Sequence, residues 1–135
     1  MPSTMLHADR FRAGEVWILF KLNDAPLATE QDGDLNIWAL MDAASRFILG
    51  TAPVPITTTE PLQFEARRLL KKGQSHNKRL PKQLFIPSGQ LSSHVAAEAE
   101  RQGITVLRVP EADLGPFIDE ARESFKERFG GGRTQ

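Results

Sequence analysis

The spacing of apolar residues changes along the chain, from runs typical of strands in its first part to helical spacing in its second part. Residues 15–22 are mostly apolar, with a continuous apolar run over 16–20, and indicate a strand that is buried on both faces. The runs 37–41 and 46–51 predict two further strands. Because only residues 42–45 separate these two runs, we expect the three strands to form an antiparallel meander.

Amphipathic segments after residue 59 predict three helices. The first is expected to be capped by Thr59 and to end at Gly73, and its apolar face consists of Leu62, Ala66, Leu69 and Leu70. The second is expected to run from Leu91 to Gly103. The third has apolar residues at three- and four-residue steps: Leu114, Phe117, Ile118, Ala121, Phe125 and Phe129.

Two short apolar runs, 84–86 and 104–109, predict strands between these helices. The complete order, β-β-β-α-β-α-β-α, predicts an α/β domain built on a five-stranded mixed sheet. Right-handed crossovers between parallel strands are expected to place helices on both faces of the sheet. The predicted core consists of Trp17, Leu19, Trp38, Leu40, Phe85, Val106, Phe117 and Phe125.

Length and composition indicate one ordinary globular domain. The 135 residues can bury a core but are too few for two domains, and we expect a flexible lead-in at 1–14, a domain at 15–129 and a disordered tail at 130–135. No cysteine is present, which excludes disulfides and cysteine-ligated metals and fits the cytoplasm. No segment predicts a signal peptide or a membrane partner. The net charge of zero argues against a strongly basic nucleic-acid binder.

Short motifs occur in order along this predicted fold. Residues 42–50, DAASRFILG, match the pattern D-x-x-S-R-x-x-x-G. Gly89, the serines that follow it and the later Gln-Gly-Ile at 102–104 resemble a D-x-G-x-x-x-S…G-I stretch, and residues 123–125 read Glu-Ser-Phe. In this order the motifs resemble the catalytic cores of retroviral integrases and transposases, over residues 15–129. The resemblance implies a ribonuclease H-like fold.

The same resemblance implies where catalytic acids would stand. That family cleaves and joins phosphodiester bonds with two metal ions held by three acidic side chains, which supply the oxygen ligands that Mg²⁺ requires. At the three corresponding positions this chain has Phe20, Pro87 and Glu123. Phe20 and Pro87 offer no side-chain ligand atom, and one glutamate cannot hold two divalent ions. We therefore predict a non-catalytic domain that has no metal site and no cofactor.

An alternative keeps a metal-dependent nuclease or polynucleotidyl transferase, with Asp24, Asp42 and Glu123 as a rearranged acid set. Asp24 lies four residues beyond the expected position and would need a change of strand register. Asp42 stands in a tight turn, where an aspartate is better explained by hydrogen bonds to the nearby backbone. The histidines have no metal spacing, and Ser88 or Ser92 is better explained as a helix N-cap than as a nucleophile.

Positive charge is concentrated in residues 60–82, which contain seven bases and two glutamates and have a local net charge of +5. The bases are Arg67, Arg68, Lys71, Lys72, Lys78, Arg79 and Lys82. A basic helix followed by a basic loop can bind phosphate groups, although a solvated helix face would have the same composition. We predict an interaction module whose partner is a nucleic acid or an acidic protein. The sequence does not predict an oligomeric state.

Overall fold

The computed structural model describes residues 11–23, 26–28, 30, 33–90 and 92–130. A five-stranded mixed sheet forms the centre of the molecule, in the order β3-β2-β1-β4-β5. The meander strands β1 (Val16–Lys21), β2 (Leu35–Asp42) and β3 (Ile48–Pro55) are antiparallel neighbours. The strands β4 (Gln83–Pro87) and β5 (Thr105–Val109) add in parallel beside β1. The predicted α/β fold, ribonuclease H-like in its element order, is confirmed.

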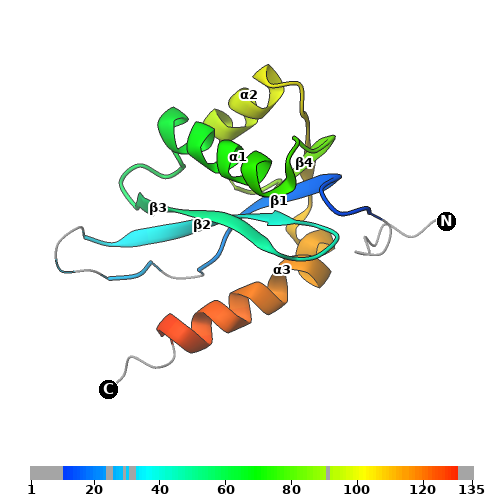
Figure 1. The fold of residues 1–135 in the computed structure, drawn as a ribbon. Helices are drawn as coiled ribbons and strands as arrows, with labels where there is room; N and C mark the ends of the chain where they lie inside the picture. Colours follow the sequence, from blue (N-terminus) through cyan, green and yellow to red (C-terminus); the bar gives the residue numbers. More distant parts are fainter. Residues whose placement is uncertain (1–10, 24–25, 29, 31–32, 91, 131–135) are drawn as a thin grey trace.

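Helices cover both faces of this sheet, as predicted. The helices α1 (Gln63–Asn77) and α2 (Ser93–Arg101) lie above the sheet in Figure 1, and α3 (Glu111–Phe125) lies below it. A short π-helical segment, η2 (Lys126–Gly130), continues α3. The expected lead-in and tail fall mostly outside the described residues, at 1–10 and 131–135.

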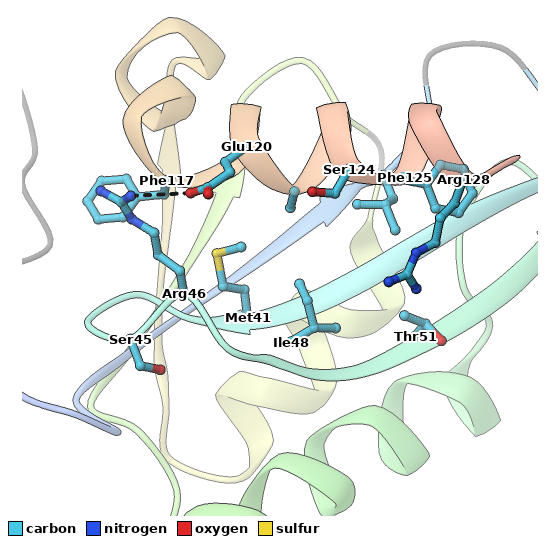
Figure 2. Close-up of a pocket in the computed structure, with 12 residues that line it drawn as sticks. Met41, Ser45, Arg46, Ile48, Thr51, Phe117, Glu120, Ser124, Phe125 and Arg128 are labelled. Atoms are coloured by element: carbon cyan, nitrogen blue, oxygen red, sulfur yellow. Dashed lines mark ion pairs between the residues drawn. The ribbon is translucent and has the colours of Figure 1, made fainter. Parts of the chain in front are cut away.

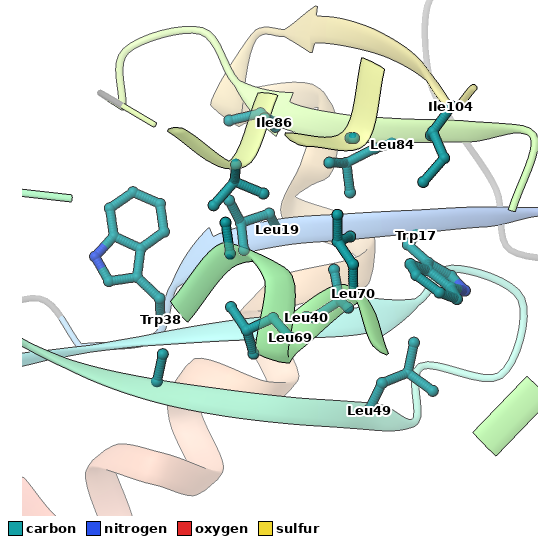
Figure 3. Close-up of a cluster of buried hydrophobic side chains, with 14 of the residues drawn as sticks. Trp17, Leu19, Trp38, Leu40, Leu49, Leu69, Leu70, Leu84, Ile86 and Ile104 are labelled. Carbon is teal, nitrogen blue, oxygen red and sulfur yellow. The ribbon is translucent and has the colours of Figure 1, made fainter. Parts of the chain in front are cut away.

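Alternate side chains of β1 supply the two halves of the core. Trp17 and Leu19 face α1 and α2, where Trp17 and Trp38 lie at opposite ends of a buried cluster (Figure 3). Val16, Ile18 and Phe20 face α3 and pack in a second cluster with Phe117. This alternation is what a strand buried on both faces requires, since successive side chains point to opposite sides.

The predicted core is confirmed at six of its eight residues: Trp17, Leu19, Trp38, Leu40, Phe85 and Phe117. Val106 and Phe125 are only partly buried. Val106 lies on the edge strand β5, which has a neighbour on one side only. Phe125 lies near the end of α3, where it lines an open groove beside the sheet.

The expected end of the first helix at Gly73 is wrong, because α1 continues to Asn77. Gly73 is buried in the helix interior, and a Cβ atom there would lie 2.6 Å from the Cη2 atom of Trp17. The glycine therefore makes room for an indole ring on the neighbouring sheet. The chain leaves the helix at Lys78, which takes the left-handed conformation (φ 69°) often found at helix ends.

The expected cap at Thr59 is also wrong, because α1 begins four residues later. Glu60 instead turns toward α2, where its Oε1 accepts a hydrogen bond from the His94 backbone N–H at 3.0 Å. The Ser93 hydroxyl contacts the other carboxylate oxygen at 3.4 Å. Ser92 precedes α2 as expected, but its side chain makes no capping bond. The N-terminus of α2 is thus satisfied by a carboxylate distant in sequence.

The third strand is longer than predicted and begins later, after a connection that extends to Phe47. Phe47 is half exposed and stacks on the His76 ring, with 4.5 Å between ring centroids. Pro53 and Pro55 interrupt the apolar run, which hides the end of the strand in the sequence. Proline is tolerated here because β3 is an edge strand whose outer side needs no backbone N–H.

Candidate functional site

The ends of the parallel strands β1 and β4 are closed by a group of polar side chains centred on Arg122 of α3. The Arg122 guanidinium donates to the backbone oxygen of Lys21, with Nε at 3.0 Å and Nη2 at 2.8 Å. Its Nη1 pairs with the Glu111 carboxylate at 2.7 Å, and its Cζ lies 5.7 Å from the centre of the Phe20 ring. One guanidinium thereby makes hydrogen bonds to a strand end, an ion pair with an acid and a cation–π contact with an aromatic ring.

Gln90, just beyond β4, completes this group. Its Oε1 accepts a hydrogen bond from the Lys21 backbone N–H at 3.1 Å, and its Nε2 contacts Glu111 at 3.4 Å. Arg108 of β5 donates from Nη1 to the Gln90 backbone oxygen at 3.0 Å. We call Lys21, Gln90, Glu111 and Arg122 the strand-end clamp.

Three positions were compared with catalytic acids through the family resemblance, and all three lie close to this clamp. Phe20 is fully buried in β1, directly before Lys21. Pro87 is the buried last residue of β4, three residues before Gln90. Glu123 is exposed on α3, immediately after Arg122. It is Arg122, and not Glu123, that α3 presents to the end of β1.

Asp42, the second acid of the alternative set, closes the turn after β2. Its Oδ1 accepts the Gly14 backbone N–H at 2.7 Å, and its Oδ2 accepts the Ser45 backbone N–H at 3.1 Å and the Ser45 hydroxyl at 2.8 Å. Asp42 pairs in register with Trp17, at the opposite end of β1 from Lys21. Asp24 lies outside the described residues. Among those described, no three His, Asp or Glu side chains gather closely enough to hold a metal ion.

The seven predicted bases lie along α1 and the segment leading to β4. Two are committed to acids: Arg67 pairs with Glu98 at 3.5 Å, and Arg68 pairs with Glu65 at 2.8 Å. The other five have no ion-pair partner within the part of the chain that the structure describes: Lys71, Lys72, Lys78, Arg79 and Lys82. We call these five residues the basic surface.

Phe64 is a further exposed residue on α1, and the sequence prediction missed it. The residue is 71% exposed, the largest value among the large apolar residues that the structure describes. It precedes Arg68 by four residues and Lys71 by seven, so the three share one side of the helix. The signal was present in the sequence, since Phe64 falls opposite the predicted apolar face of that helix.

A groove also opens between α3 and the strands β2 and β3, with a volume of about 660 Å³ (Figure 2). Met41 and Ile48 of the sheet and Phe125 of α3 give it an apolar lining. At one end Arg46 pairs with Glu120 at 3.7 Å. The groove exists because α3 leaves part of this sheet face uncovered, which also accounts for the partial burial of Phe125.

Glu98 of α2 is the buried acid that joins α1 to α2. Arg101 donates to its carboxylate through Nε at 3.3 Å and also through Nη2. Gln102 donates to the same carboxylate at 2.7 Å, and Arg67 of α1 forms an ion pair with it between the two helices. The hydrogen bond from Arg101 is the largest cause that lowers the pKa of Glu98, from the ordinary 4.5 to about 2, and Gln102 adds to it against the opposing effect of burial.

Because the folded-state pKa of Glu98 is depressed, its contribution to stability is present above pH 4.5 and is lost as the pH falls toward 2. A Glu98→Gln variant is expected to unfold at lower urea concentration than the wild type at pH 7. The difference should shrink between about pH 5 and pH 2, as protonation removes the charge in the wild type. Glu100→Gln, on the exposed side of the same helix, is the control. A difference independent of pH would contradict this role for the Glu98 charge.

Comparison with solved structures agrees with the fold. The chain is similar to the catalytic core domain of BIV integrase, with a TM-score of 0.54 and 13% identity, covering 85% of this chain and 68% of that one. The HTLV-2 integrase catalytic core domain, in complex with magnesium, gives a TM-score of 0.48 and 11% identity, covering 90% and 77%. No protein-family model and no curated protein matches the sequence. The match to the BIV integrase core shows that the fold is ribonuclease H-like, of the kind found in integrase cores.

No helix among the described residues is long and apolar enough to cross a membrane.

Proposed function

We propose that this chain is a non-catalytic ribonuclease H-like domain that binds the phosphate backbone of nucleic acid through its basic surface. The absence of cysteine is compatible with this role in the reducing cytoplasm. The proposal has two parts, the loss of metal-dependent chemistry and the gain of a binding role, and different residues support them.

The strand-end clamp supports the first part. Two-metal phosphoryl transfer needs several carboxylates that converge on one point. At the end of β1 the described side chains are instead a buried phenyl ring and a guanidinium, Phe20 and Arg122. The nearby carboxylate of Glu111 is already paired with Arg122. These residues do not suit a divalent metal, because a fixed positive charge stands beside the position where the ions would bind.

The single observation that supports the binding role is that the five cations of the basic surface have no acid partner among the described residues. Bases kept for structural ion pairs would be expected to face acids, as Arg67 and Arg68 do. The exposed Phe64 ring lies on the same helix and favours nucleic acid over an acidic protein, because unpaired bases stack on aromatic side chains.

The double substitution Lys71→Glu with Lys72→Glu reverses two charges and is expected to weaken binding to a 20-nucleotide single strand by at least about tenfold at low salt. The favourable term is the release of counterions from phosphate, so wild-type binding should also weaken steeply with salt. Both lysines are exposed, so the variant is expected to fold. Fluorescence anisotropy over a series of salt concentrations measures both effects.

The matched control is Lys126→Glu with Arg128→Glu, which changes the net charge equally at the far end of α3. This control should bind within about twofold of the wild type if local contacts dominate over net charge. Equal loss in both double variants, or no wild-type binding at low salt, would contradict the proposal.

A further inference from the structure

A cavity of about 480 Å³ opens beside the N-terminal ends of β1 and β4, at the end of the sheet opposite the strand-end clamp. Its charged lining consists of Arg12, Arg79, Lys82 and one acid, Glu15. None of the three bases has an ion-pair partner in the described part of the chain. Three cations and one carboxylate give the cavity a net positive charge.

Main-chain hydrogen bonds hold both walls of this cavity in place. On one wall, the Gly14 N–H donates to Asp42, and the Glu15 N–H donates to the Arg12 oxygen at 3.0 Å. On the other wall, the Lys82 N–H donates to the Glu15 oxygen at 2.8 Å, and the Lys82 oxygen accepts the Thr105 N–H at 3.1 Å. The cationic side chains thus extend from a fixed frame, which lowers the ordering cost of binding.

The acid in the cavity accepts a hydrogen bond from the backbone. The Glu15 Oε1 accepts the Arg12 backbone N–H at 3.0 Å. Near Gly14, the buried Nδ2 of Asn77 has no hydrogen-bond acceptor among the residues that the structure describes, and a Cβ atom on Gly14 would lie 3.6 Å from it. Gly14 lines the cavity, so this amide donor lies close to it, while the three cations of the lining favour an anion over a cation or an apolar group.

From this cavity we infer that Arg12, Arg79 and Lys82 form a binding pocket for a phosphate group. Arginine binds phosphate oxygens through two parallel N–H bonds, and lysine adds a point charge. The inference rests on the proposed function, since Arg79 and Lys82 belong to the basic surface and a backbone phosphate would enter here. A free phosphate has the same chemistry, and the experiment distinguishes the two sources.

The first arm measures thermal unfolding with inorganic phosphate against chloride at equal ionic strength. Phosphate is expected to raise the melting temperature of the wild type, because a ligand that binds only the folded state stabilises it. Arg12→Ala and Arg79→Ala should each weaken the apparent phosphate affinity about fivefold or more, while Lys126→Ala leaves it unchanged. All three side chains are exposed, so the variants are expected to fold. No phosphate-specific shift, or equal loss in Lys126→Ala, would overturn the pocket.

The second arm measures binding of the 20-nucleotide strand to the same variants. A pocket that takes a backbone phosphate predicts at least fivefold weaker binding for Arg12→Ala, although Arg12 lies outside the basic surface. If Arg12→Ala loses inorganic phosphate but keeps the strand, the ligand is free phosphate and the link to nucleic acid is overturned. If Arg12→Ala loses both while the Lys71 and Lys72 reversal keeps the strand, the pocket is supported and the wider basic surface fails.

Discussion

Replacing Phe117 by alanine is expected to lower the free energy of unfolding by about 3–5 kcal/mol, the usual cost of removing a large buried ring. Phe117 is fully buried on α3 and belongs to the cluster that joins this helix to β1 and β2. Its ring also lies 6.1 Å from the Phe11 ring and 6.0 Å from the Arg46 guanidinium carbon. Truncation therefore removes contacts to the sheet, to the segment before β1 and to the turn after β2.

Urea denaturation followed by circular dichroism measures this loss. Phe47→Ala is the matched control, because that ring is half exposed and stacks mainly on His76. It should cost less than about 1 kcal/mol, as surface changes generally do. Equal stability of wild type and Phe117→Ala would mean that α3 does not contribute to the core.

Gly73→Ala is expected to destabilise the protein by about 1–3 kcal/mol, the usual cost of overpacking a core. The expectation opposes helix propensity, which favours alanine over glycine by about 1 kcal/mol inside a helix. The added Cβ would meet the Trp17 ring at 2.6, 2.9 and 3.0 Å, and Trp17 is fully buried. A ring enclosed on all sides cannot move aside at low cost.

A double-mutant cycle separates the clash from other effects. In a Trp17→Phe background the smaller ring leaves space, so Gly73→Ala should cost less than it does in the wild type. Ser75→Ala, on the exposed side of the same helix, is the control and should change the stability little. Stabilisation by Gly73→Ala in the wild-type background would contradict the packing described.

The order of strands and helices followed from the sequence because each element has a strong local pattern. The β1 run is apolar at every position from Val16 to Phe20, and all of these residues are buried. The ends of the helices could not be predicted in this way, because Gly73 and Glu60 make contacts with other elements. Gly73 accommodates Trp17, and Glu60 caps α2. No pattern within a short window of sequence indicates such partners.

The candidate sites differ in the same way. The charge of the basic surface could be counted from the sequence, but only the folded chain shows that its five cations have no acid partner among the described residues. The strand-end clamp could not be predicted, because Arg122 and Lys21 are separated by 101 residues. The resemblance to integrase cores indicates Glu123, but the side chain of α3 that reaches β1 is that of its neighbour Arg122.

Cleavage of labelled DNA, RNA and hybrid duplexes, with and without millimolar Mg²⁺ or Mn²⁺, tests most directly whether this ribonuclease H-like domain is catalytic. We predict no metal-dependent cleavage or strand transfer by the wild type, and the same result for Glu123→Gln. This prediction rests on the proposed function, in which the positions compared with the catalytic acids hold Phe20, Pro87 and Glu123. Arg122 also places a positive charge beside Phe20. Metal-dependent cleavage by the wild type that disappears in Glu123→Gln would contradict this account and indicate a metal site that includes Glu123.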